Sequence, residues 1–440
     1  MAVSLLVSSF AAAALLFRIT PSRNANWRLA IMQSALWHGL LIVVWTELLS
    51  YDRALTATTV TMLWGWLAGI HAVLLGYRLR QRKARSAIVL RQAVKQLAVT
   101  PHHSQSALAI ERIIIPVVIM STIGLCLLRG WLEPPYNYDA MTYHLPRVMH
   151  WIQNHTVAHY PTHNLRQISF APGAAYLLTH LHLLTGGDYG DNCIQGLAFV
   201  VCILGTSLIA PSDQKHSQVL TALVCASVPM AIMQASTCQT DLLVSCWLVC
   251  AAYFVLKPEQ SLPDWWWLAV AIGLAIVTKP TGIIFGLPLL MVQAWRLLMQ
   301  SRQLCLRTLL HSLFLPAIVL LAALSLSLPS YGRNLQTFGT PLGTTAGTTN
   351  TLVSFPAILS TILRNLALSL PFPPLWQWIQ AIHQQFLGLD VNHPNITYGD
   401  NRFDIDNLWW RILLPEDENF VGNPVHLLLI GVAVGMLVMT

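Results

Sequence analysis

Charge is what this sequence has least of. Only 10% of its 440 residues are Asp, Glu, Lys or Arg, and 55% are hydrophobic, whereas soluble domains carry about 25% charged residues. A soluble chain of this composition would expose large apolar patches and aggregate. The sixteen Trp suit the interfacial regions of a bilayer, where an apolar ring meets water at one edge. The composition therefore excludes a soluble globular domain and predicts an integral membrane protein.

Several familiar signatures are also missing. The eight Cys contain no C-x-x-C pair, and those within apolar runs are expected to act as small core hydrophobes. The Gly/Thr-rich segment 339–350 lacks the lysine of a phosphate-binding P-loop and is expected to be a flexible external loop. No basic start precedes the apolar stretch Met1–Phe17, so we expect a first span and not a cleaved signal peptide. The net charge of +7 is assigned to cytoplasmic loops, so no nucleic-acid partner is expected.

Apolar runs suited to crossing about 30 Å of hydrocarbon predict an all-α, polytopic helical membrane protein with about eleven transmembrane helices. The runs are Met1–Phe17, Leu29–Leu49, Ala54–Gly76, Ala107–Leu128, Cys193–Ala210, Val219–Met233, Leu242–Leu256, Trp265–Thr278, Gly282–Leu298, Leu309–Leu328 and Val425–Thr440. Two further apolar segments carry polar residues: Pro172–Leu184 is expected to lie on the membrane surface, and Leu352–Leu370 is expected to be interfacial or re-entrant. We expect three regions: 1–106, a core at 107–370 with a long first external loop at 129–192, and 371–440.

The orientation follows from the basic residues. Seven Lys and Arg occur between Arg78 and Lys95 with no acid among them, which predicts a cytoplasmic segment. Alternation of the spans then places two other basic clusters inside, one at 18–28 and one at 296–307. The same alternation places loop 129–192 outside, together with segment 371–424, which is rich in acids and poor in Lys and Arg.

The first external loop holds the main candidates for chemistry. Asp139, Tyr143, His144 and Arg147 are spaced so that, on a helix, the first two share one face and the last two share a neighbouring one. A carboxylate close to the headgroup plane can act as a general base on a hydroxyl or an amine. The other three can hold a phosphate, and Arg147 is suited to bidentate contact. The alternative is that Asp139 only caps the following helix.

Three later residues fall at span ends on the same predicted face: Asp241, Lys279 and Arg333. Each has an ordinary alternative, since Asp241 can be a helix N-cap and the two cations can be snorkelling anchors. Lys and Arg are scarce on outer faces. Two of them beside Asp139 and Asp241 therefore suggest an anionic ligand at the outer interface, such as a lipid-linked phosphate.

A metal site is not predicted. His155, His159 and His163 recur at helical spacing, but Pro161 interrupts the register and no carboxylate joins them at ligand spacing. They are expected to be loop histidines. No cofactor is predicted, although a requirement for a divalent metal stays open.

The order of these features resembles the GT-C glycosyltransferases. Asp139 follows a membrane exit, and PGAAYLLTHLHLLTGGDYGDN then leads into a span. The later stretches QTDLLVSCWLVCAAYF, GLAIVTKPTGIIFGLPLL and GRNLQTFGTPLG are similar to segments of that superfamily. The likeness covers about Leu128–Gly343 and is greatest to the protein-mannosyltransferase-like and aminoarabinose-transferase-like branch and to the Rgt-type lipopolysaccharide transferases.

This resemblance implies a polyprenyl-phosphate-sugar donor in the bilayer and an inverting transfer to a glycan, lipid or protein acceptor. It implies a multi-pass protein of the cell (inner) membrane whose active face is periplasmic or extracellular. Asp139 corresponds to the catalytic base, and Lys279 and Arg333 to holders of the donor phosphate. The sequence departs from the family in two ways: Ala140 stands where the mannosyltransferases have a second acid, and three spans precede the one that leads into the loop.

Two other functions stay open. A transporter or flippase of a lipid-linked or anionic substrate would place ionisable groups near the bilayer midplane. The predicted span centres carry almost no charge, since Glu47 and Glu111 fall near span ends, and no internal repeat is evident. A non-catalytic assembly subunit with a degenerate transferase fold is the third possibility.

Overall fold

The computed structural model describes residues 2–19, 26–93, 113–211, 213–300, 306–344, 352, 354–370, 372–388, 390–393 and 421–439. Helices are the only regular secondary structure in these ranges, so the prediction of an all-α protein is confirmed. The contacts within the chain define two compact units. Unit 1 comprises residues 1–226 and 235–341, and unit 2 comprises residues 227–234 and 342–440.

Unit 1 contains the helices on which the predicted site residues lie. They are α1 Ala2–Ile19, α2 Trp27–Tyr51, α3 Ala57–Ala93, α4 Ile115–Leu132, the π-helical turn η2 Ala140–His144, α5 Leu145–Asn154, α6 Arg166–Ser169, α7 Gly173–Thr185, α8 Cys193–Ile209, α9 Lys215–Ala226, α11 Asp241–Leu256, α12 Leu262–Thr278, α13 Thr281–Gln300, α14 Leu306–Ser325 and α15 Leu328–Phe338.

Five described helices are long and apolar enough to cross a membrane: α1, α2, the 57–81 part of α3, α4 and α13. A sixth is counted if α14 and α15, which are bent by 62° at a short break, form one broken span. α8, α11 and α12 have only 16 or 17 residues, which is about 25 Å at 1.5 Å per residue. The predicted number of about eleven spans is therefore not confirmed.

One predicted span is interrupted. The run Val219–Met233 divides into α9, which ends at Ala226, and α10 Pro229–Gln234. Proline has no backbone N–H and fits the first turn of a helix, and α10 begins at Pro229. Hydropathy alone did not reveal this break, because both pieces are apolar.

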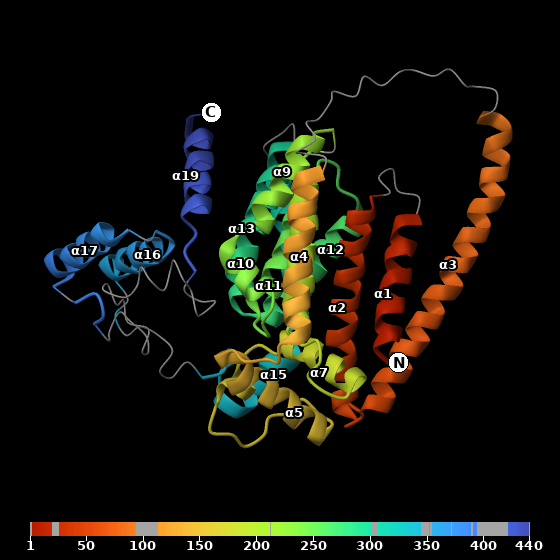
Figure 1. Cartoon of the computed structure of the whole chain (residues 1–440), viewed down its shortest axis with the longest axis horizontal. Coiled ribbons are helices and arrows are strands. Elements are labelled where there is room, and N and C mark those ends of the chain that lie inside the picture. Colours follow the sequence, from red (N-terminus) through yellow and green to blue (C-terminus); the bar gives the residue numbers. More distant parts are fainter. Residues whose placement is uncertain are drawn as a thin grey trace. The chain divides into compact units, whose positions relative to one another are not determined.

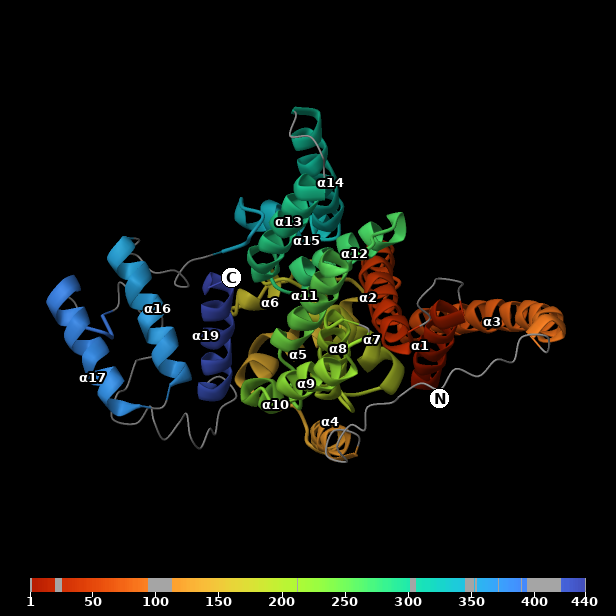
Figure 2. The ribbon, with the colours of Figure 1, turned by 90° about the horizontal axis from the view of Figure 1, so that it is seen from above.

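The middle of unit 1 is formed by α2, α8, α11 and α12, with α4 and α14 at its periphery (Figure 2). Gly39 of α2 shows how closely these helices approach each other. A Cβ atom at this position would lie 3.0 Å from Leu274 of α12 and 3.1 Å from Trp247 of α11. Small residues allow such approaches between apolar helices.

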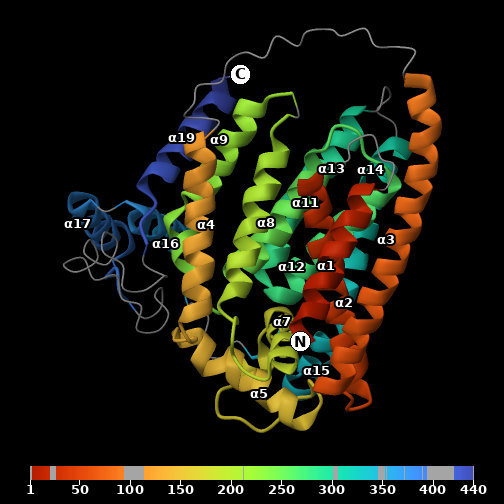
Figure 3. The same cartoon turned by 45° about the vertical axis from the view of Figure 1, so that its right-hand side comes forward.

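One end of unit 1 is built differently from the rest. Here α5, α7 and α15 gather beyond the ends of the long helices (Figures 1 and 3). We call this part, residues 133–192 together with α15, the site end. α7 begins directly against α12, because a Cβ at Gly173 would lie only 2.8 Å from the Val277 carbonyl oxygen and 2.9 Å from the Thr278 backbone. The predicted surface segment Pro172–Leu184 is thus a helix with its first turn packed on the end of α12.

Unit 2 contains α10, α16 Phe355–Ser369, α17 Pro373–Ile382, the π-helical turn η3 His383–Leu387 and α19 Pro424–Met439. α16 and α17 pack together through Trp376, which is buried and whose indole N–H donates to the Ala367 carbonyl at 3.1 Å. The segment Leu352–Leu370 is helical over 15 residues. That it is interfacial or re-entrant stays a prediction.

Candidate functional site

Asp139 immediately precedes the π-helical turn η2. Its backbone already has helical angles, and its side chain makes no capping hydrogen bond. The interpretation of Asp139 as a helix cap is therefore wrong. Instead the carboxylate accepts a hydrogen bond of 3.1 Å from the Tyr143 hydroxyl, which confirms that these two side chains share a face. Short π-helical segments inside helices are frequent at functional sites.

Tyr143 is buried and keeps its proton. Burial raises the pKa of its phenol first, and the negative charges of Asp139 and Asp241 raise that pKa further. Tyr143 is thus a permanent donor to Asp139. The half-exposed Asp139 carboxylate can still receive a proton from a third group.

His144 is the most deeply buried of the predicted ligand-binding residues after Arg147. It is 2% exposed, and neither ring nitrogen has a hydrogen-bond partner. Burial lowers its pKa to about 3, and the positive charges of Arg147 and Lys279 act in the same direction. His144 is therefore neutral at physiological pH, with one ring nitrogen able to donate and the other able to accept.

Arg147 does not present its charge to a ligand. Its guanidinium, in a residue 1% exposed, donates to three backbone carbonyls: Gln167 at 2.5 Å, Arg166 at 2.7 Å and Ala171 at 3.2 Å. Burial lowers its pKa to about 10, so it remains charged at neutral pH. Arg147 fixes the segment 166–171, which leads into α7. This geometry does not support the predicted contact of Arg147 with a phosphate.

Lys279 and Asp241 form a solvent-accessible ion pair. Lys279 leaves the end of α12 in an extended conformation, as expected before Pro280. Its Nζ lies 2.6 Å from the Asp241 Oδ1, and the side chains are 40% and 42% exposed. Thr240, not Asp241, is at the N-cap of α11, so the capping interpretation of Asp241 was also wrong. The negative charge of Asp241 adds to the raised pKa of Tyr143, and the positive charge of Lys279 adds to the lowered pKa of His144. The ion pair therefore lies beside η2.

Arg333 is held by an acid that the sequence analysis did not select. Its two terminal nitrogens donate to the Glu47 carboxylate at 2.7 and 2.9 Å, and one of them also donates to the Tyr176 hydroxyl at 2.9 Å. Tyr176 in turn donates to Glu47. The Arg333 and Glu47 side chains are 19% and 14% exposed. An acid in the last two turns of an apolar helix was the available signal, since ionisable groups in such helices have partners.

The seven predicted residues thus come together at and beside the site end of unit 1, on η2, α5, α11, α12 and α15. The positive charge of Arg333 lowers the pKa of Arg147 and of His159, which connects the Arg333 cluster to the segment that carries Asp139. His159 lies 2.7 Å from the Thr337 hydroxyl of α15, and His155 contacts the Leu55 carbonyl. Among the residues that the structure places, no three His, Cys, Asp or Glu side chains are grouped to hold a metal.

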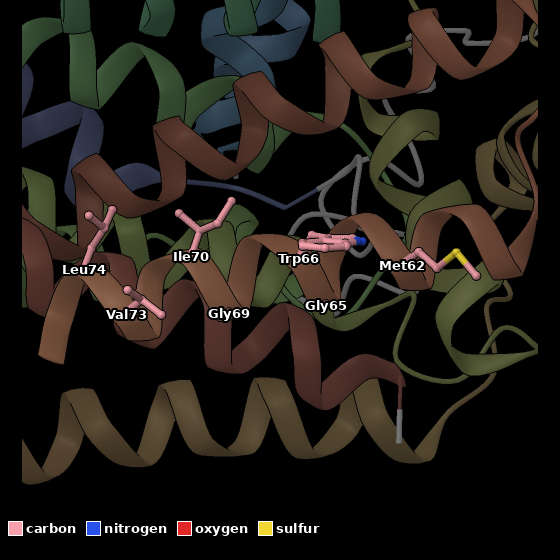
Figure 4. A pocket seen from close by; sticks show the side chains of 7 residues that line it. All are labelled: Met62, Gly65, Trp66, Gly69, Ile70, Val73 and Leu74. Carbon is pink, nitrogen blue, oxygen red and sulfur yellow. The ribbon is translucent and has the colours of Figure 1, made fainter.

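A separate groove of about 580 Å³ lies along one face of α3 (Figure 4). It is apolar, and it contains none of the predicted site residues; its lining consists of Met62, Gly65, Trp66, Gly69, Ile70, Val73 and Leu74. The groove therefore contributes nothing to the chemistry at the site end.

Residues 169–328 match the family model of the dolichyl-phosphate-mannose-protein mannosyltransferases, membrane glycosyltransferases of the GT-C type. The expected resemblance is thereby confirmed over this segment. It includes Tyr176, Asp241 and Lys279, whereas Asp139, Glu47 and Arg333 lie outside it. Neither a search of curated proteins nor a search of solved structures gave a match.

Proposed function

From the match of residues 169–328 to a family of membrane glycosyltransferases, we propose that this chain transfers a sugar from a polyprenyl-phosphate donor to an acceptor at the external membrane face, with Asp139 as general base. The observation that carries the proposal is the state of Asp139. Its half-exposed carboxylate makes no capping bond, is oriented by Tyr143, and lies on the segment next to the accessible cation Lys279. The acceptor is a hydroxyl or an amine of a lipid, a glycan or a protein.

The reaction is a single displacement. Asp139 takes the proton of the acceptor as the acceptor oxygen or nitrogen forms a bond to the anomeric carbon. The bond from that carbon to the phosphate oxygen breaks, and the electron pair remains on the polyprenyl phosphate. One displacement inverts the anomeric carbon. The leaving phosphate gains negative charge, so a cation held near it stabilises the transition state.

Lys279 is the better candidate for that cation. Exposed ion pairs such as Lys279–Asp241 contribute only about 0–1 kcal/mol, so Lys279 can turn from Asp241 to a phosphate at little cost. Arg333 is in a partly buried bidentate pair, and uncoupling such a pair by removing one partner costs about 3–5 kcal/mol. Arg147 is fully used by backbone carbonyls. The ring nitrogens of His144 are buried, so this residue is not assigned a ligand contact.

The test is Asp139→Asn in membranes supplied with polyprenyl-phosphate-sugar. We expect a loss of about 10²–10⁴-fold in transfer rate, the usual contribution of a general base, with unchanged expression. Asp188→Asn is the matched control, because Asp188 is an exposed acid of the same loop. Full activity of the Asp139 variant would exclude Asp139 as the base.

A lipid-linked-substrate transporter is the second candidate. One observation favours it: His38 and His71 are buried ionisable groups on helices apolar enough to span a membrane. Reconstituted protein should then move a fluorescent polyprenyl-phosphate analogue between leaflets, and Asp139→Asn should leave that movement intact.

A further inference from the structure

A cluster of buried polar side chains connects the N-terminal helices of unit 1 to α7. Its three histidines are His38 on α2, His71 on α3 and His180 on α7, and all three are buried. The Ser9 hydroxyl of α1 lies 3.1 Å from both His38 Nε2 and His71 Nδ1. The Trp64 indole N–H of α3 donates to His180.

The hydrogen bonds of His180 fix its tautomer. The Trp64 indole N–H can only donate, and it lies 3.1 Å from His180 Nδ1, so Nδ1 accepts. The neutral ring therefore carries its proton on Nε2, which donates to the Thr46 hydroxyl at 3.0 Å. The Thr46 hydroxyl in turn donates a hydrogen bond to the Ile42 carbonyl at 2.6 Å. Both ring nitrogens of His180 are thus satisfied by α2 and α3.

The other half of the cluster is equally determined. His38 Nδ1 lies 2.7 Å from the Ser34 carbonyl, which only accepts, so Nδ1 carries the proton and Nε2 accepts from Ser9. His71 Nδ1 is 3.2 Å from the Ser9 carbonyl and is likewise a donor. The His38 ring stacks on Trp64 with planes 4° apart. These hydrogen bonds join α1, α2 and α3 to one another, and Trp64 connects the group to His180 of α7.

α7 connects this hydrogen-bonded cluster to the site residues. Its first residue, Gly173, packs on the backbone of Thr278, next to Lys279. One turn later, Tyr176 hydrogen-bonds Glu47 and Arg333. A further turn on, on the same face of α7, His180 binds Thr46, the neighbour of Glu47.

We propose that α7 is the strut that sets the spacing between Lys279 and Arg333, and that His180 is the positioning residue that holds this strut to α2 and α3. His180 itself touches neither cation, so it acts through Tyr176 and Gly173. The kinetic part of this inference rests on the proposed transferase function, whereas the structural part does not.

The structural part is tested by a distance measurement in the full-length protein. Spin labels on ketone-bearing amino acids at the exposed positions Pro280 and Gln336 report the separation of the ends of α12 and α15 without altering native cysteines. We expect a broader distance distribution in His180→Leu than in the parent protein. His180→Gln should keep the narrow distribution, because an amide can both accept from Trp64 and donate to Thr46. Identical distributions in all three proteins would overturn the proposal.

The kinetic part uses two matched tryptophan substitutions. Trp64→Phe removes the donor to His180 and part of a buried ring, whereas Trp45→Phe shortens the ring that packs edge-on against Trp64 at 4.9 Å. We expect Trp64→Phe to raise the donor KM roughly fivefold, the equivalent of one hydrogen bond, with kcat unchanged and thermal stability lowered by the lost ring volume. Equal donor KM values in the two variants would refute the role of His180. If the parent protein transfers no sugar, the proposed function fails, and the distance measurement still decides the strut.

Discussion

The burial of His144 predicts an acid-sensitive site end. His144 is neutral in the folded protein because its pKa is lowered to about 3 by burial and by the charges of Arg147 and Lys279. A histidine in the unfolded chain has a pKa of about 6.5. The stabilisation is therefore complete above pH 6.5 and is lost as the pH falls from 6.5 towards 3, since only the opened segment can take up the proton.

The magnitude follows from the difference in proton uptake. Each pH unit between the two pKa values costs the folded segment about 1.4 kcal/mol. Acidification from pH 6.5 to pH 5 therefore costs about 2 kcal/mol. If opening is local, this corresponds to about a thirtyfold fall in hydrogen-exchange protection over η2 and α5.

Hydrogen–deuterium exchange in nanodiscs at pH 7.5 and pH 5, corrected for the intrinsic pH dependence of exchange, measures this effect. His144→Phe is the control, because it keeps a buried aromatic ring without a titrating group and should abolish the loss of protection in η2. A smaller acid effect should persist in the segment around His159, whose pKa is lowered to about 4, first by burial and then by Arg333 and Arg147. Equal protection of η2 at both pH values would refute the neutral, buried state of His144.

Two further outcomes separate the roles of the two cations. Lys279→Ala should raise the donor KM with little loss of thermal stability, because its ion pair is half exposed; the KM of the parent enzyme should also rise with salt, whereas that of the variant should not. Glu47→Gln should lower thermal stability by about 3 kcal/mol in free energy, since it leaves the buried Arg333 charge without its partner; a tighter donor complex in that variant would show instead that Glu47 competes with the phosphate for Arg333.

Local features of the site were predictable from the sequence. The apolar runs located α1–α4, and Pro146 lies in the first turn of α5, a position that proline favours. The spacing of Asp139 and Tyr143 predicted their shared face, because that relation depends on only four residues of helix. The alternation of the spans also predicted that Asp241, Lys279 and Arg333 lie at helix ends on one side. That prediction needs only the order of the helices along the chain and not how they pack.

The partners of the charged residues were not predictable in the same way. Glu47 and Arg333 are 286 positions apart, and only the packing of α2, α7 and α15 brings them together. The direction of the Arg147 side chain was equally hidden, because a sequence does not show that three carbonyls of segment 166–171 face it. The number of spans stays unconfirmed because hydropathy does not separate a full span from an apolar helix of 16 or 17 residues.

If Asp139 is the general base, as we propose, position 140 is unsuited to the second acid that the resemblance to the mannosyltransferases would place there. Ala140, at the position of the second acid, is fully buried in η2. A carboxylate there would lose its hydration without a partner, which is costly for any charged group. Glu47 and Asp241 are each already paired with a cation, Arg333 and Lys279 respectively. Asp139 accepts its hydrogen bond from the Tyr143 phenol and not from a cation, so we propose it as the carboxylate that takes the proton of the acceptor.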